Sequence, residues 1–115
     1  MPIVYKIVDT ATWREAERQA VFHGSAHDMR DGFIHFSTAA QVAETAAKHF
    51  AGQADLLLVH VDTGRLGDRL KWEPSRGGQL FPHLYAPLDL GAVAKVEPLP
   101  LGADELHILP PLPER

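Results

Sequence analysis

The sequence predicts an α+β fold with a mixed, mainly antiparallel sheet and two helices. Short segments rich in β-branched and aromatic residues recur along the chain, which is typical of strands. Two other segments repeat their apolar residues at helical spacing. The strand-like segments cluster after the second helical one, and this order favours antiparallel or mixed pairing over a doubly wound parallel sheet.

The composition fits a single domain. The 115 residues are 45% hydrophobic and 23% charged, which is ordinary for a soluble globular protein. We expect residues 1–115 to form one domain, with an extended proline-rich tail over about residues 109–115. Membrane spans need roughly 20 apolar residues and secretory signals need a basic segment before an apolar run. Neither pattern is present, so we expect a cytoplasmic protein without membrane contact.

Charge and cysteine content narrow the possible partners. The net charge of -4 argues against an extended nucleic-acid surface but permits a small, nucleotide-like ligand. The absence of cysteine excludes disulfides, thiolate metal sites and cysteine nucleophiles. No P-loop and no G-x-G-x-x-G fingerprint occurs. The oligomeric state does not follow from these features.

The first helix is predicted to follow a buried strand. Residues 3–8 are continuously apolar and β-branched, apart from one lysine, as in a strand buried on both faces. Thr12 and Glu15 match a capping box that would open a helix, and Gly24 would end it. A polar loop over residues 24–32 is expected next.

The second helix is predicted to follow a strand over residues 33–37. Thr38 and Gln41 form another capping-box pattern, so we expect this helix to begin at Ala39 and to stop at Gly52. The second half of the chain then reads mostly as strands, about five to seven in all. These later strands are expected over residues 55–62, 69–73, 81–85 and 92–97.

A polar pair on the strand before the second helix is the first candidate for a site. His35 and Ser37 share one face of this strand with Phe33, because side chains alternate between faces. A polar pair among large apolar residues is unusual for a strand that only builds a core. We predict that both contact a polar ligand. The alternative is that His35 is a satisfied buried histidine and that Ser37 caps the second helix.

Two further segments carry candidate groups. Glu73 lies between an aromatic residue and a proline, a setting that favours a raised pKa and acid–base or cation-stabilising work, and the alternative is a surface carboxylate. Phe81, His83 and Tyr85 share a strand face and would wall a ring-bearing ligand, unless they only form a half-buried strand. The predicted pocket combines these groups with the polar pair: His35, Ser37, Glu73, His83 and Tyr85.

A zinc site is the weaker interpretation. His35, His60, His83 and Glu73 are competent ligands, but their separations are long and none forms an HxH, HExxH or HxxxH motif. We therefore expect no metal, and a metal-dependent enzyme stays as an alternative.

Several motifs resemble a known family. The runs at residues 31–37, 41–42, 70–73 and 81–85 are similar to those of a bacterial family catalogued as domain of unknown function 952, over about residues 5–98. More distantly, the chain resembles the ADP-ribosyltransferase-like superfamily. Its catalytic members hold NAD in the cleft of a split mixed sheet. The resemblance therefore implies a split sheet and NAD as a possible substrate.

The same resemblance implies roles for individual residues. His23, with Gly24 and Ser25, looks like an early element that contacts the nicotinamide ribose. Ser37 looks like the central pocket element, and Glu73 like the later acidic residue that stabilises the reacting ribose. The segment over residues 81–85 has no counterpart in that superfamily.

The leading hypothesis is an NAD- or nucleotide-using enzyme of the ADP-ribosyltransferase type. A non-catalytic small-molecule binding module on the same fold is the first alternative, and a metal-dependent enzyme is the second. The predicted catalytic residues are Glu73, His35 and Ser37. The predicted substrate-binding residues are His23, Gly24, Ser25, Trp72, Phe81, His83 and Tyr85.

Overall fold

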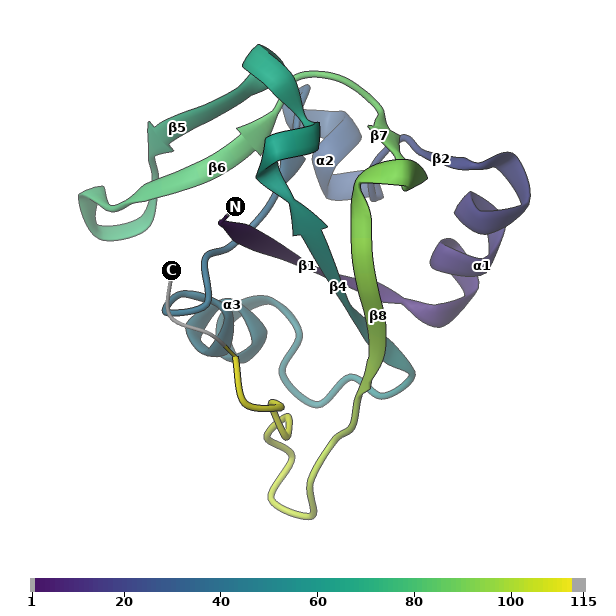
Figure 1. Cartoon of the computed structure of the whole chain (residues 1–115). Helices are drawn as coiled ribbons and strands as arrows, with labels where there is room; N and C mark the ends of the chain where they lie inside the picture. The colour runs from purple at the N-terminus through teal and green to yellow at the C-terminus, as the bar shows by residue number, and fades with distance from the viewer. Residues whose placement is uncertain (1, 113–115) are drawn as a thin grey trace.

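Within the residues that the structure describes, three α-helices, four short 3-10 helices and eight strands make up the regular structure (Figure 1). The computed structural model describes residues 2–112, apart from the side chain of Arg76. None of the helices in this part is long and apolar enough to cross a membrane. The helices are α1 (Thr10–Gln19), α2 (Ala26–Asp31) and α3 (Val42–His49). The strands are β1 (Ile3–Asp9), β2 (Val21–Phe22), β3 (Ile34–His35), β4 (Leu56–Asp62), β5 (Leu70–Pro74), β6 (Leu80–Leu84), β7 (Leu88–Asp89) and β8 (Val93–Leu99).

The strands form two larger sheets and one small one. The larger sheets have the orders β1-β4-β8 and β3-β6-β5, and β2 pairs with β7. Each of these pairings is antiparallel, so the α+β class and the mainly antiparallel pairing are confirmed. The edge strand β1 meets the chain beyond β3 at an isolated bridge between Tyr5 and Ser37. Two backbone hydrogen bonds of 2.8 and 2.9 Å close this bridge.

The helices α1 and α3 cover opposite faces of the β1-β4-β8 sheet. Side chains alternate along β1, so Val4 and Val8 face one way and Tyr5 and Ile7 the other. The first face packs on Trp13 of α1 and on the core side of the β3-β6-β5 sheet. The second face packs on α3. Each continuously apolar strand is therefore buried on both sides, as the sequence predicts.

The longer strands lie where the sequence predicts them. β1, β4, β5, β6 and β8 each begin and end within two residues of the predicted bounds. The predicted strand over residues 33–37 is shorter, because β3 covers Ile34–His35 and the chain then leaves the ladder for the bridge at Ser37. The two-residue strands β2 and β7 are too short for a periodic signal and are absent from the prediction.

The first helix begins and ends earlier than predicted. Asp9, not Thr12, is its N-cap, and the Asp9 carboxylate accepts a 2.9 Å hydrogen bond from the backbone N–H of Thr12. The helix ends at Gln19, because Ala20 takes a left-handed conformation with φ of 63°. Gly24 is therefore not its cap, since β2 intervenes.

The loop predicted over residues 24–32 contains a third helix, so the expectation of two helices is wrong. Ser25 and Asp28 form a capping box at its start, in which each side chain accepts a hydrogen bond from the other residue's backbone N–H. Gly32 ends the helix with φ of 88°. The segment is polar and spans only six residues, so it lacks the apolar periodicity that reveals longer helices.

The helix α3, the second of the two helices predicted from the sequence, starts later than predicted. The Gln41 side chain accepts a 3.0 Å hydrogen bond from the backbone N–H of Thr38, as a capping box requires. A turn nevertheless precedes the helix, which begins at Val42 rather than Ala39. The Gln41 amide also donates to the carbonyl oxygen of Leu80 at 2.9 Å, so the start of α3 is tied to β6.

The proline-rich tail is described as far as residue 112. Residues 109–112 form neither helix nor strand, and Leu109 and Leu112 pack against the α3 side of the core. Residues 113–115, the rest of the predicted tail, lie outside the described residues.

Candidate functional site

A cleft of about 500 Å³ lies where the two larger sheets diverge. Its walls come from β1, from α2, from the segment around β3, from β6 and from the end of α3. The lining combines imidazole rings, hydroxyls and three phenyl rings with two carboxylates and a lysine. Such a mixture of apolar surface and a few convergent polar groups is typical of small-molecule sites.

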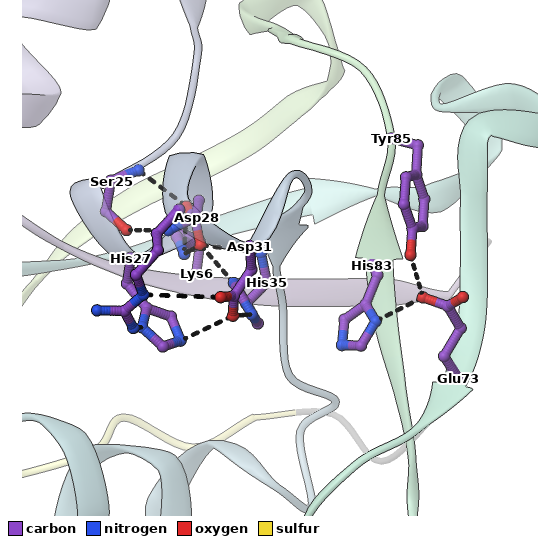
Figure 2. A network of polar contacts seen from close by, with 10 residues as sticks. Lys6, Ser25, His27, Asp28, Asp31, His35, Glu73, His83 and Tyr85 are labelled. Atoms are coloured by element: carbon purple, nitrogen blue, oxygen red, sulfur yellow. Dashed lines mark hydrogen bonds and ion pairs between the residues drawn. The ribbon is translucent and has the colours of Figure 1, made fainter.

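Asp28 ties the two sheets together beside this cleft. One of its carboxylate oxygens lies 2.8 Å from the Nζ atom of Lys6, on β1. The other lies 2.6 Å from Nδ1 of His35, on β3, and also accepts a 3.1 Å hydrogen bond from the backbone N–H of His35. Figure 2 shows these contacts converging on Asp28 from both sides.

The Lys6–Asp28 ion pair is buried. Asp28 is 1% exposed and Lys6 is 7% exposed. Burial opposes the charged form of Asp28, but the hydrogen bond from His35 and the charge and hydrogen bond of Lys6 outweigh it. They hold the pKa of Asp28 well below its usual range. Burial also lowers the pKa of Lys6, while Asp28 favours its charged form. Asp28 is therefore an anion that accepts hydrogen bonds and does not exchange protons near neutral pH.

The local sequence explains why Asp28 takes this position. The capping box with Ser25 holds the Asp28 carboxylate over the first turn of α2. Gly24 precedes the cap with φ of +110°, and a Cβ atom there would lie 2.8 Å from the Cβ of Asp28. Only glycine fits this conformation and this close approach.

His35 lies between two carboxylates. Nδ1 of its ring faces Asp28, and Nε2 lies 3.0 Å from Oδ2 of Asp31. The same Asp31 oxygen lies 3.4 Å from Nε2 of His27. The rings of His27 and His35 are 4.6 Å apart between centroids. Two imidazoles from α2 and β3 thus meet on one carboxylate at the cleft wall.

A second carboxylate–histidine pair joins β5 and β6. Oε1 of Glu73 accepts hydrogen bonds from Nδ1 of His83 and from the hydroxyl of Tyr85, each of 2.7 Å. The hydrogen bond from His83 and then that from Tyr85 lower the pKa of Glu73. The raised pKa that the sequence suggested is therefore wrong, because the flanking aromatic residue and proline do not bury the carboxyl group.

The cleft brings together half of the predicted site residues. His35, Ser37, Phe81 and His83 line it together with Ser25, although they come from three separate stretches of sequence. The Ser37 hydroxyl is hydrogen-bonded to Thr45 on α3 at 2.8 Å, and Gln41 is the N-cap residue of that helix. Ser37 does not cap the second predicted helix.

The other predicted residues do not line the cleft. Glu73 reaches it through His83, and Tyr85 donates to the same Glu73 oxygen from the residue that follows β6 (Figure 2). Trp72 is 45% exposed and points away from the Glu73 face of β5, since neighbouring side chains alternate. His23 is exposed, and Gly24 serves the turn into α2. The predicted ligand contacts of these residues remain predictions.

Sequence reasoning missed four groups of the site: Lys6, His27, Asp28 and Asp31. The pattern Ser25-x-x-Asp28 is a helix-start signal that could have revealed α2. A helix there would place His27 and Asp31 on one face, four residues apart. The partnership between Asp28 and Lys6 has no such local signal, because it spans 22 residues.

The sequence matches a family described as a protein of unknown function, DUF952, over residues 7–96. The matched region contains β1 from Ile7 onward, both carboxylate–histidine pairs and most of β8. The chain belongs to this family. The family resemblance predicted from the sequence motifs is therefore confirmed, and the family description assigns no activity to it.

Solved structures of a similar fold come from a protein of Caulobacter crescentus. The crystal structure of its protein CC0527 has a TM-score of 0.89 and 50% identity, and the match covers 92% of this chain and 93% of that one. The solution NMR structure of CC0527 gives a TM-score of 0.83 and 51% identity, over 92% of this chain and 91% of that one. No protein with a curated description matches the sequence.

Proposed function

We propose that this DUF952 protein binds a nucleotide-like small molecule of the NAD type in the cleft between its two larger sheets and breaks the nicotinamide–ribose bond, releasing nicotinamide while a nucleophile such as water takes the ribose. The observation that carries the proposal is the cleft itself. It has about 500 Å³ of space, and predicted ligand contacts from separate parts of the sequence line it. The ADP-ribosyltransferase resemblance supplies the ligand class.

The lining supports both parts of such a ligand. Phe36 and Phe81 offer flat apolar surface on which a ring can pack. Ser25 and Ser37 offer hydroxyls, and imidazole nitrogens add donors and acceptors for ribose oxygens. A cleft of this kind orients a sugar through several hydrogen bonds while excluding bulk water from one face.

The reaction needs negative charge near the sugar. Breaking the nicotinamide–ribose bond leaves an oxocarbenium-like ribose, which a nearby anion stabilises. In this scheme the Glu73 carboxylate lies behind His83, whose ring stands between Glu73 and the cleft, so its negative charge acts on the sugar only across that ring. Glu73 thus acts as a positioning residue for His83 in this scheme, and His83 is the group that touches the substrate.

Calorimetric titration with NAD and ADP-ribose, together with chromatography of released nicotinamide, tests the proposal. We expect saturable binding that His83→Gln weakens by about tenfold, the effect of one good hydrogen bond. The matched control His107→Gln changes a histidine outside the cleft and leaves binding unchanged. We expect Glu73→Gln to slow nicotinamide release by about 100-fold with little change in affinity. Absence of binding to both nucleotides would exclude the proposal.

A non-catalytic binding module on the same fold is the second candidate. The position of Glu73 favours it, since the carboxylate is 38% exposed and reaches the cleft only through a histidine. This candidate predicts that NAD or ADP-ribose binds equally well before and after Glu73→Gln, with no nicotinamide release from either form. The same two measurements therefore separate the candidates.

A further inference from the structure

We propose that His27, Asp31 and His35 form a binding site for one divalent transition-metal ion at the wall of the cleft. This site does not depend on the proposed function, because it requires only the three side chains and the metal. Of the four zinc ligands weighed in the sequence, it contains only His35, since His60 pairs with Glu97 on β8 and His83 pairs with Glu73. Within residues 2–112, these three residues are the group whose ligand atoms gather closely enough for one ion.

The ligand atoms already lie close to metal-binding positions. Oδ2 of Asp31 is 3.0 Å from Nε2 of His35 and 3.4 Å from Nε2 of His27. All ligand atoms of the group are within 4.8 Å of one another. Ligands at about 2.1 Å from a tetrahedral ion stand about 3.4 Å apart, so the Asp31–His27 separation fits and the Asp31–His35 separation must widen slightly. The two histidine nitrogens, within 4.8 Å of each other, complete the set.

The sequence places the ligands at regular spacing. His27 and Asp31 lie four residues apart on α2, on one side of the helix. Gly32 then ends the helix, and the chain turns directly into β3, which presents His35 four residues after Asp31. Two ligands on one helix and a third on the adjoining strand give a compact arrangement with little chain to order.

Asp28 completes the arrangement from behind. Metal-binding histidines commonly donate their second ring N–H to a carboxylate, which fixes the tautomer and the ring orientation. Asp28 is buried, and one of its oxygens lies 2.6 Å from Nδ1 of His35 and accepts a hydrogen bond from the backbone N–H of the same residue. Nε2 is therefore the ring nitrogen of His35 that faces Asp31, and it must give up the proton of that contact to bind the ion. Lys6 balances the charge of Asp28, which leaves the Asp31 carboxylate to balance the ion.

The donor set indicates the class of ion. Two imidazole nitrogens and one carboxylate oxygen suit zinc, cobalt, nickel or ferrous iron. Calcium and magnesium prefer oxygen ligands alone, and this group supplies too few of them. Three protein ligands beside an open cleft leave coordination positions for water or for a ligand of the cleft.

The positive charge of Arg30 disfavours binding of a cation at this site, so a variant without this charge tests the proposal directly. Its guanidinium contacts Nδ1 of His27, and its Nε lies 3.7 Å from Asp31. The Arg30 contact makes Nδ1 the acceptor and leaves the proton on Nε2, where the ion must bind. The Arg30 side chain is 69% exposed, so it can turn into solvent when the ion binds. Removing its charge should therefore strengthen metal binding.

Titration of the full chain, prepared without an affinity tag, with cobalt(II) alone provides the experiment. Visible absorption reports coordination, and zinc competes for the same site. We expect one ion per chain. His27→Gln and Asp31→Asn should each weaken binding by about 10- to 100-fold. Both side chains are exposed, so these variants keep the fold, which circular dichroism checks. The control His107→Gln changes a histidine outside the group and should bind as the parent does.

The outcomes separate this site from adventitious binding. Stronger cobalt binding by Arg30→Gln, with weaker binding by the two ligand variants, supports the site. The site is excluded if no stoichiometric binding occurs, or if the ligand variants and His107→Gln bind cobalt equally well. It is also excluded if Arg30→Gln weakens binding, since a guanidinium cannot ligate the ion. None of these readouts involves NAD, so failure here leaves the proposed function standing.

Discussion

Two carboxylate–histidine pairs face each other across the β3–β6 ladder, and their surroundings differ sharply. His35 and His83 are register partners with ring centroids 5.4 Å apart. Asp28, the partner of His35, is buried against a lysine, whereas Glu73, the partner of His83, stands on an edge strand beside solvent. Figure 2 shows the two networks separately.

The two pairs have different structural roles, although each joins a carboxylate to a histidine. Asp28 is held by a helix cap, an ion pair and a histidine, so its removal disturbs both sheets. Glu73 accepts hydrogen bonds from His83, on β6, and from Tyr85, which directly follows β6. Its loss therefore affects neighbouring groups rather than the fold. The pair with the buried carboxylate fixes the architecture of the cleft, whereas the pair with the partly exposed carboxylate contributes little to it.

The largest effect is expected when the buried ion pair between Lys6 and Asp28 is broken. Asp28→Asn leaves the Lys6 charge buried without its partner, which should lower the free energy of unfolding by about 3–5 kcal/mol in urea denaturation. Glu73→Gln, the matched change in the exposed pair, should leave the urea midpoint nearly unchanged. The double variant Lys6→Met with Asp28→Asn should recover part of the loss, because no unpaired charge remains. Equal midpoints for Asp28→Asn and Glu73→Gln would contradict the comparison.

A smaller loss of stability is expected from substitution of the glycines near each pair, Gly24 and Gly77. Gly24→Ala forces a side chain into an unfavourable φ and against Asp28, which should cost about 2–3 kcal/mol in the same denaturation measurement. Gly77, in the loop between β5 and β6, has φ of +64°, and a Cβ atom there would meet no other atom within 4 Å. Gly77→Ala should therefore cost only about 1 kcal/mol. A greater loss at Gly77 would show that the exposed pair has the stricter backbone requirement.

The smallest effect concerns the proton of Tyr85. The hydrogen bond to Glu73, then burial and the negative charge of Glu73, raise the pKa of Tyr85 above its usual value near 10. Glu73→Gln removes the negative charge, so this pKa should fall toward the usual value. Ultraviolet absorbance of the phenolate follows the titration, and Tyr85→Phe distinguishes this group from Tyr5. An unchanged or higher pKa of Tyr85 in Glu73→Gln would show that the carboxylate does not control the phenol.

The sequence predicted the frame of the fold because burial leaves a local pattern. β1 and β4 are continuously apolar runs, and such runs are buried on both faces wherever they pair. His35 and Ser37 stood out for the same reason, since alternation along a strand places polar groups on one face. These signals need only neighbouring residues.

The contact between Asp28 and Lys6 has no such local signal in the sequence. Asp28 appears in the sequence as one polar residue in a polar loop, and its burial depends on Lys6 from another strand. Lys6 in turn appears as a single charge in an apolar run. Alternation places Trp72 and Glu73 on opposite faces of β5, but which of these faces meets the cleft depends on the pairing with β6. Tertiary pairing decided all three positions.

The bridge between Tyr5 and Ser37 has a mechanical consequence. It holds one edge of the β1-β4-β8 sheet against the chain that leaves β3. Asp28 adds a side-chain tie between the same two sheets, since it contacts Lys6 on one and His35 on the other. The amide protons of Tyr5 and Ser37 are hydrogen-bonded within the bridge, so they exchange with deuterium only when the bridge itself opens. Their exchange rates therefore report how often the two larger sheets come apart at this edge.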